Sequence, residues 1–173
     1  MYLFLPGNNK GNKEWCESLK DVFEGNNQMI YYDHWKGEGN INWDTELEKI
    51  KDLNIKEKVN VVGKSAGCVL GMKAHTLGYI DVNKYIFIGF PYYWTKQRGD
   101  NVDELLDNLK TDSLFIQKPH DPVIGYEELN TILRSKHLNV STLGYERVTE
   151  PSNNHDYEDI QYLYKVISDF VNS

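Results

Sequence analysis

A serine between two closely spaced glycines is the feature of this sequence that most directly suggests chemistry. Residues 63–67 read Gly-Lys-Ser-Ala-Gly, with Ser65 at the centre. A β-branched run at 59–62 predicts a buried strand, and the residues from Ala66 onward predict a helix. On so tight a turn, a side chain two residues before or after the serine would collide with its surroundings, so both positions favour glycine. The pattern predicts a nucleophile elbow, with Ser65 at the positive end of a helix.

Two other interpretations of this stretch are a structural turn and a phosphate-binding loop. A glycine-rich turn can serve only to pack a helix tightly on a sheet. A phosphate-binding loop requires a glycine five residues before Gly63, where the chain has Lys58. It also requires a glycine-rich loop after the strand, whereas here the strand runs straight into Gly63. We reject the phosphate-binding loop, and the structural turn stays as the alternative.

A serine nucleophile needs a base within hydrogen-bond distance, and that base needs an orienting carboxylate. In a parallel sheet, these groups come from loops at the carboxyl ends of strands. Of the five histidines, His155 follows a predicted strand and precedes the last predicted helix, so we predict it as the base. We predict Asp121 as the acid, because it follows the strand at 113–117 and Pro122 fixes its turn. The alternative role for Asp121 is to cap the next helix, and the reserve acids are Asp100 and Asp103.

Two backbone N–H groups are candidates for stabilising an oxyanion. The N–H of Ala66 qualifies because it directly follows the nucleophile. The second should come from the loop after the first strand, where Gly7 allows the backbone to approach and Asn8 supplies the N–H. The alternative for this loop is an ordinary Pro-Gly-Asn turn, a common composition.

Strands alternate with helices along the whole chain, which predicts a parallel sheet covered on both faces. Apolar runs predict strands at 2–5, 28–32, 59–62, 84–89, 113–117 and within 140–148, most specifically at 144–148. Helices are expected at 13–23, 43–53, from 66 onward, and at 102–109, 126–133 and 157–170. A polar loop is expected at 33–40 and an aromatic loop from 90 to 94. Without repeats or linkers, residues 1–173 should form a single α/β domain.

The composition limits which binding partners and which cellular location we expect for the protein. The net charge is −7, which argues against nucleic acid or an anionic membrane surface as the main partner. No run approaches the ~18 apolar residues of a membrane span, and residues 1–6 lack the basic segment of a signal peptide. The two cysteines, Cys16 and Cys68, fall on predicted helices, so a disulfide framework is not expected. These features predict a cytoplasmic protein.

The chain resembles the small, lid-less serine hydrolases of the α/β-hydrolase superfamily over essentially its whole length. The resemblance is carried by four motifs: residues 5–8 (LPGN), 63–67 (GKSAG), 120–123 (HDPV) and 154–157 (NHDY). The order Ser, Asp, His is the order of that family. The chain departs from the family at Lys64, where relatives often have another large residue, and at Pro6, where they commonly have histidine. It is also short, which implies about six strands in the spatial order 2-1-3-4-5-6 and no cap domain.

The resemblance implies an acyl-enzyme mechanism, and we predict a serine hydrolase acting on a small ester or thioester. Ser65, His155 and Asp121 would form the triad, with no cofactor and no metal ion. The aromatic residues Tyr92, Tyr93, Trp94 and Trp35 could line an apolar cleft for the acyl substrate, or they could pack under loops or face a protein partner. Two alternatives are a binding or regulatory protein with little turnover and an acyltransferase using the same triad.

Overall fold

Six strands form one sheet in the order β2-β1-β3-β4-β5-β6, and every neighbouring pair is parallel. The strands are β1 (Tyr2–Leu5), β2 (Gln28–Met29), β3 (Val59–Lys64), β4 (Val82–Ile88), β5 (Ser113–Gln117) and β6 (Ser141–Gly144). This computed structural model describes residues 1–37 and 39–173. The predicted parallel sheet and its strand order are confirmed.

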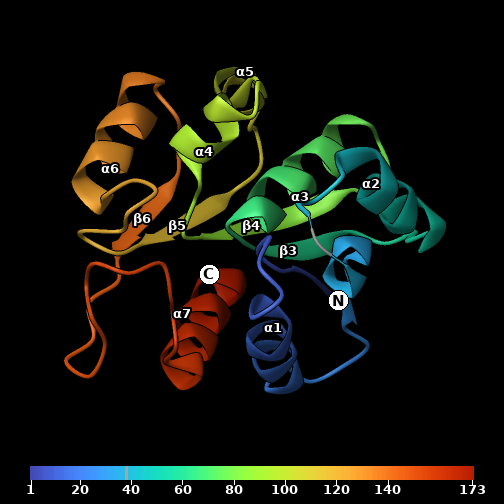
Figure 1. Ribbon diagram of the computed structural model, residues 1–173, viewed down its shortest axis with the longest axis horizontal. Coiled ribbons are helices and arrows are strands. Elements are labelled where there is room, and N and C mark those ends of the chain that lie inside the picture. The colour runs from blue at the N-terminus through green and yellow to red at the C-terminus, as the bar shows by residue number, and fades with distance from the viewer. Residues whose placement is uncertain (38) are drawn as a thin grey trace.

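Helices cover both faces of the sheet (Figure 1). On one face lie α1 (Asn12–Asp21) and α7 (Ile160–Asn172), which contact each other. The other face carries α2 (Trp43–Asp52), α3 (Ala66–Thr76), α4 (Tyr92–Gln97), α5 (Val102–Asp107) and α6 (Tyr126–Ser135). A 3₁₀ helix, η1 (Asp33–Lys36), follows β2. No cap domain is present in the part of the chain that the structure describes.

The centre of the sheet is buried on both faces, because β3 and β5 are buried along their whole length. Helix α3 is apolar from Ala66 to Met72 and has eight buried residues, with polar side chains only in its last turn. Glycine lets this helix lie close to the sheet. At Gly71 an added Cβ would lie 2.9 Å from Val61 Cγ1. The helix that begins after Ser65 is therefore fixed against the central strands.

Several element boundaries differ from the sequence predictions. The strand expected at 28–32 is only Gln28–Met29, and the last helix begins at Ile160 rather than at residue 157. The loop expected at 33–40 contains the 3₁₀ helix η1, and its residue Glu38 lies outside the described residues.

Two further predictions were wrong in kind or in place. The aromatic loop expected at 90–94 is largely helix, since α4 begins at Tyr92 and buries that ring. A last strand does lie within 140–148, but it is Ser141–Gly144 rather than the more specific 144–148. Val148, at the end of the predicted strand, is fully exposed. Within the described residues β6 pairs with β5 alone, and such an edge strand can be built from polar residues.

In the chain outside residue 38, no helix is long and apolar enough to cross a membrane.

The close approach of α3 to β1 gives a direct test of this packing. A Cβ at Gly67 would lie 1.9 Å from the backbone oxygen of Leu5, where no side-chain rotation can relieve the overlap. We expect Gly67→Ala to destabilise the protein by about 3 kcal/mol or more, measured by chemical denaturation. Gly37→Ala is the control, because a Cβ there meets nothing within 4 Å. Equal stability of the two variants would contradict this packing.

Candidate active site

Ser65 lies on the turn between β3 and α3, as the sequence predicts. Its backbone has φ 50° and ψ −120°, a conformation that residues with a side chain rarely adopt. The Ser65 N–H donates to the carbonyl of Ile88 at 2.9 Å, which ties the turn to the end of β4. A Cβ at Gly63 would lie 2.7 Å from the Cys68 nitrogen, so the glycine before the serine is also required by space. The structure thus holds Ser65 at the carboxyl end of the sheet.

His155 and Asp121 form a direct pair. Nδ1 of His155 lies 2.8 Å from Oδ2 and 2.9 Å from Oδ1 of Asp121. The Asp121 carboxylate is 0% exposed and also accepts the hydroxyl of Tyr157 at 2.7 Å and the N–H of Val123 at 3.0 Å. The Asp121 carboxylate is fixed because it accepts hydrogen bonds from three donors. It binds Nδ1 of His155 and so orients the imidazole with Nε2 pointing away from Asp121.

The imidazole of His155 lies beside the strand end that holds Ser65. A Cβ added at Gly89 would lie 2.7 Å from Cε1 of His155, and Gly89 directly follows Ile88, whose carbonyl binds the Ser65 N–H. The Nε2 atom of His155 is buried and has no hydrogen-bond partner among residues 1–37 and 39–173, Ser65 included. The structure therefore brings His155 and Asp121 together, and it places an unpartnered imidazole nitrogen at the edge where Ser65 lies.

The loop after β1 approaches the turn closely, since the carbonyls of Leu5 and Pro6 both touch the Cβ position of Gly67. Within the described residues, neither the Asn8 nor the Ala66 backbone N–H donates a hydrogen bond. Free backbone donors of this kind can stabilise an oxyanion, and that role for these two N–H groups stays a prediction.

The side chains of His34 and Trp35 and the backbone of Ile41 fix Asn8. Its carbonyl accepts from Nε2 of His34 at 2.7 Å and from Nε1 of Trp35 at 3.0 Å. Its side-chain Oδ1 accepts the N–H of Ile41 at 2.7 Å. The sequence analysis missed this role of His34 and Trp35, because a contact between distant loops leaves no local pattern.

Solved structures resemble this arrangement over nearly the whole chain. A protein named provisionally as a YdeN-like hydrolase, from Pectobacterium atrosepticum, shares 14% identity at a TM-score of 0.71, with 99% of this chain and 90% of that chain covered. An esterase from Exiguobacterium antarcticum shares 15% identity at a TM-score of 0.68, with coverage of 99% and 91%.

The chain has the α/β-hydrolase fold.

An uncharacterized protein from Bacillus cereus also matches, at 17% identity and a TM-score of 0.66, where 99% of this chain covers 60% of that longer chain. No protein-family model and no curated protein sequence matches the chain.

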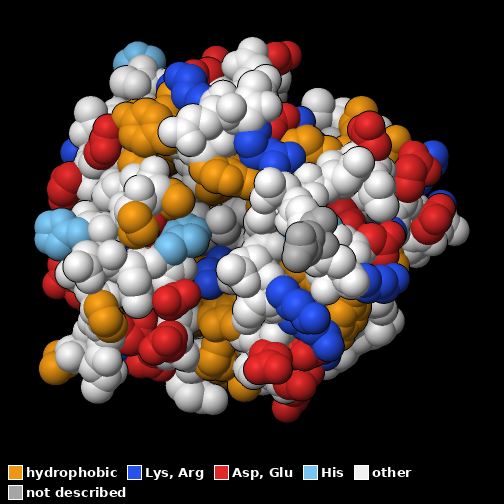
Figure 2. Space-filling view, viewed as in Figure 1, with side chains coloured by type: hydrophobic (Ala, Val, Ile, Leu, Met, Phe, Trp, Pro, Cys, Tyr) orange, Lys and Arg blue, Asp and Glu red, His pale blue; other side chains and the backbone are white. Residues whose placement is uncertain are grey.

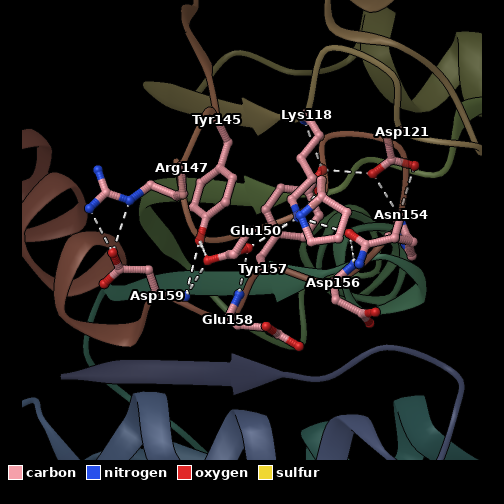
Figure 3. Close-up of polar contacts among 12 residues, drawn as sticks. Lys118, Asp121, Tyr145, Arg147, Glu150, Asn154, Asp156, Tyr157, Glu158 and Asp159 are labelled. Atoms are coloured by element: carbon pink, nitrogen blue, oxygen red, sulfur yellow. Dashed lines mark hydrogen bonds and ion pairs between the residues drawn. The ribbon is translucent and has the colours of Figure 1, made fainter.

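A buried lysine holds the loop that carries His155 in this hydrolase fold (Figure 3). Lys118, which directly follows β5, is 1% exposed. Its ammonium contacts Glu150 at 3.1 Å, the carbonyl of Pro151 at 2.8 Å and Oδ1 of Asn154 at 2.8 Å. All three partners lie in the five residues before His155, so this single charge fixes the loop immediately upstream of the imidazole.

Tyr157 links the same lysine to the acid. The backbone N–H of Lys118 donates to the Tyr157 hydroxyl at 3.1 Å, and that hydroxyl donates to Asp121. Burial, followed by the charge of Asp121, raises the pKa of Tyr157 well above its usual value, so the hydroxyl remains protonated and a donor. Loops after β5 and before α7 are thus joined by a continuous chain of hydrogen bonds.

Glu150 receives the other bonds of this network. Its carboxylate accepts the Tyr145 hydroxyl at 2.6 Å and the backbone N–H groups of Glu158 and Asp159 at 3.1 and 2.8 Å. Burial alone raises the pKa of Glu150, but the bonds from Tyr145, Glu158, Lys118 and Asp159 outweigh it and hold the pKa below the usual value. The glutamate is therefore ionised and paired with Lys118. The sequence analysis missed this pair because a lysine and a glutamate 32 positions apart show no local spacing signal.

The aromatic residues predicted to line a substrate cleft lie in different places. Trp35 is 7% exposed and Tyr92 is 6% exposed, with the Tyr92 hydroxyl bound to Asp103. Tyr93 is exposed and its hydroxyl donates to Glu128. Trp94 is partly buried, with its ring against Trp43. Contact of these four residues with a substrate stays a prediction.

The reserve acids are engaged away from His155. Asp103 accepts from Lys96 at 2.8 Å and from Lys136 at 3.1 Å. Chiefly through Lys96, this lowers the pKa of Asp103 to about 2. Asp100 contacts Lys73 at 2.8 Å. Of the three predicted carboxylates, Asp121 is the one that the structure places on the imidazole.

Both cysteines are buried free thiols, and burial raises the pKa of each well above its ordinary value. Cys68 is 0% exposed, and its Sγ contacts the Gly63 carbonyl at 3.1 Å. The described part of the chain holds no cluster of three His, Cys, Asp or Glu side chains suited to a metal ion.

Removing one partner of the buried Lys118–Glu150 ion pair should lower the stability of the protein more than replacing both partners. We expect Lys118→Met to lower the free energy of unfolding by about 3–5 kcal/mol, because it leaves the Glu150 carboxylate buried and uncompensated. The double variant Lys118→Met with Glu150→Gln should recover part of that loss. Chemical denaturation measures both, and Lys51→Met, at an exposed pair with Glu48, is the control with little expected change. A Lys118→Met variant as stable as that control would contradict the structural role of the pair.

Proposed function

We propose that the chain is a serine hydrolase that cleaves a small ester or thioester through an acyl-enzyme. The observation that carries the proposal is the Asp121–His155 pair, with a free Nε2, at the sheet edge where Ser65 occupies a positive-φ turn. The hydrolase names of the similar structures support the same reaction class, although likeness at this level of identity concerns the fold.

In the first half of the proposed reaction, Ser65 Oγ attacks the substrate carbonyl while His155 Nε2 takes its proton. The Asp121 carboxylate holds the proton on Nδ1, which leaves Nε2 basic, and stabilises the imidazolium as it forms. The developing oxyanion would accept bonds from the N–H groups of Ala66 and Asn8. The imidazolium then protonates the leaving alcohol or thiol, which departs and leaves an ester on Ser65.

In the second half, His155 takes a proton from water, and the water attacks the acyl ester. Collapse of this second oxyanion breaks the bond to Ser65, whose oxygen regains the proton from His155. The lack of a protein partner at Nε2 among the described residues suits this step, because no other protein donor competes for the base. Hydrogen bonds between a nucleophile and its base are often long in free enzymes and tighten only when substrate binds.

Two alternatives are separated by experiment. A binding or regulatory protein on the same fold is favoured by one observation, the lack of a Ser65–His155 hydrogen bond among the described residues. An acyltransferase would use every residue of the proposed triad and differ only in the acceptor. Adding an alcohol to the reaction and measuring the ratio of transfer to hydrolysis distinguishes the acyltransferase.

The nucleophile is tested by covalent labelling. We expect a fluorophosphonate probe to label wild-type protein at Ser65 alone, detected by intact-protein mass spectrometry and peptide mapping, because a base activates only this serine. Ser65→Ala should abolish labelling and hydrolysis of p-nitrophenyl esters, and His155→Ala should slow both. Ser18→Ala, on the exposed face of α1, is the matched control and should label normally. If wild-type protein takes no label, or Ser65→Ala still does, the binding-protein alternative replaces the hydrolase.

The acid is tested by a conservative substitution. Asp121→Asn keeps the size of the side chain but can donate to Nδ1, which puts the proton on the wrong imidazole nitrogen. We expect kcat to fall by roughly 10³- to 10⁴-fold with folding retained. Asp103→Asn and Asp100→Asn, whose carboxylates bind lysines instead, should stay close to wild type. The assignment fails if Asp121→Asn is nearly as active as wild type while either of these is inactive.

A further inference from the structure

The lysine before Ser65 is largely buried, and its ammonium makes no direct polar contact within the described residues. Lys64 is 4% exposed, yet within residues 1–37 and 39–173 no carboxylate lies within ion-pair distance of its ammonium and no acceptor binds it. Its nearest recorded partner is the ring of Trp15, whose centroid lies 4.8 Å from Nζ. The other deeply buried lysine, Lys118, has three oxygen partners at 2.8–3.1 Å. A largely buried lysine whose ammonium has no oxygen partner in the protein is available to bind an anionic group of a ligand.

A cleft adjoins this ammonium and the proposed base. Its volume is about 430 Å³, within the range of small-molecule sites, and Lys64, Trp15 and His155 all line it. The amide residues Asn9 and Asn12 line it as well, and Oδ1 of Asn12 is buried without a hydrogen-bond partner in the described chain. The cleft therefore connects a free positive charge with the imidazole that would act on the scissile carbonyl.

The charges around the cleft limit what can bind. Two exposed carboxylates, Asp156 and Glu158, stand at its edge and repel anions. Across the face drawn in Figure 2, acidic and basic side chains are interspersed rather than gathered into one basic surface. Burial holds the pKa of Lys64 below its usual value, although the charges of Asp156 and Asp121 oppose this shift. One buried ammonium behind an acidic edge suits a single carboxylate better than a dianionic phosphate.

We propose that Lys64 binds a carboxylate at the far end of the acyl group, so that the substrate is a half-ester or half-thioester of a small dicarboxylic acid. This inference rests on the proposed hydrolase function. With the ester carbonyl at Ser65, the neighbouring Lys64 would hold the acyl chain beside His155, and Trp15 would cover its methylene groups. An ester that lacks the carboxylate would leave the Lys64 ammonium unpaired, which is the basis of discrimination.

The kinetic test compares two p-nitrophenyl esters of equal carbon number, the glutaric half-ester and the neutral pentanoate. Wild-type protein should give the higher kcat/KM with the half-ester. In Lys64→Met, the ratio of the two kcat/KM values should fall by about 30-fold or more, because a buried charge pair has lost one partner. Lys13→Met removes one positive charge from the exposed face of α1 and should keep the wild-type ratio. An unchanged ratio in folded Lys64→Met, or a wild-type preference for pentanoate, would overturn the inference.

A binding measurement separates this inference from the proposed function. Glutarate titrated into Ser65→Ala should bind, by calorimetry and by a change in tryptophan fluorescence, and Lys64→Met in the same background should bind at least tenfold more weakly. Inorganic phosphate at equal concentration should bind more weakly than glutarate. If glutarate binds through Lys64 while no ester is cleaved, the site stands and the hydrolase fails. If esters are cleaved through Ser65 but glutarate does not bind, the hydrolase stands and the carboxylate site is wrong.

Discussion

The contact between the start of α3 and the end of β1 constrains the rest of the molecule. Gly67 sits so close to the Leu5 carbonyl that no side chain fits, and this sets how deeply the helix enters the sheet. The turn before it must reverse within a few residues, which forces Ser65 into a positive-φ conformation. The same contact brings the loop after β1 beside Ala66. The contact between Gly67 and the Leu5 carbonyl therefore determines where Ser65 lies and how α3 is oriented. It also brings the loop that carries Asn8 close to the serine.

The two buried lysines show how the fold uses charge in opposite ways. Lys118 is surrounded by oxygen atoms, so its desolvation is offset and its position is fixed. Lys64 lies at a comparable depth but faces an aromatic ring and a cleft. The ammonium of Lys118 stabilises the folded protein through its oxygen partners and has no free position at which to bind a ligand. Lys64 lacks such partners among the described residues, which lowers the stability of the folded protein. A loss of stability of this kind is expected at a residue that binds a ligand.

The parallel sheet and the Ser65 turn could be predicted because local signals report them, whereas the strand order came from the resemblance to the α/β hydrolases. Alternation of apolar runs with helical periodicity identifies a parallel sheet, and the glycines at 63 and 67 reflect a steric demand that only a tight strand–helix turn makes. The pairing of His155 with Asp121 followed from placing both at strand ends, a rule of topology. Errors occurred where a local signal was weak or misleading. The edge strand β6 is polar, and the aromatic run at 92–94 looked like a loop although Tyr92 packs inward from a helix.

The side chains that hold the site together could not be predicted, because each acts across a long separation. Residues 150–159 contain no helix or strand, so no backbone ladder fixes the segment that carries His155. Its position must come from side chains on neighbouring strand ends, and Lys118 after β5 and Tyr145 after β6 supply them through Glu150 (Figure 3). At the other end of the segment, Arg147 contacts Asp159 at 2.7 Å, just before α7 begins. A loop braced at both ends can hold an imidazole against a carboxylate without regular structure. The density of charged and aromatic residues here therefore serves to position His155.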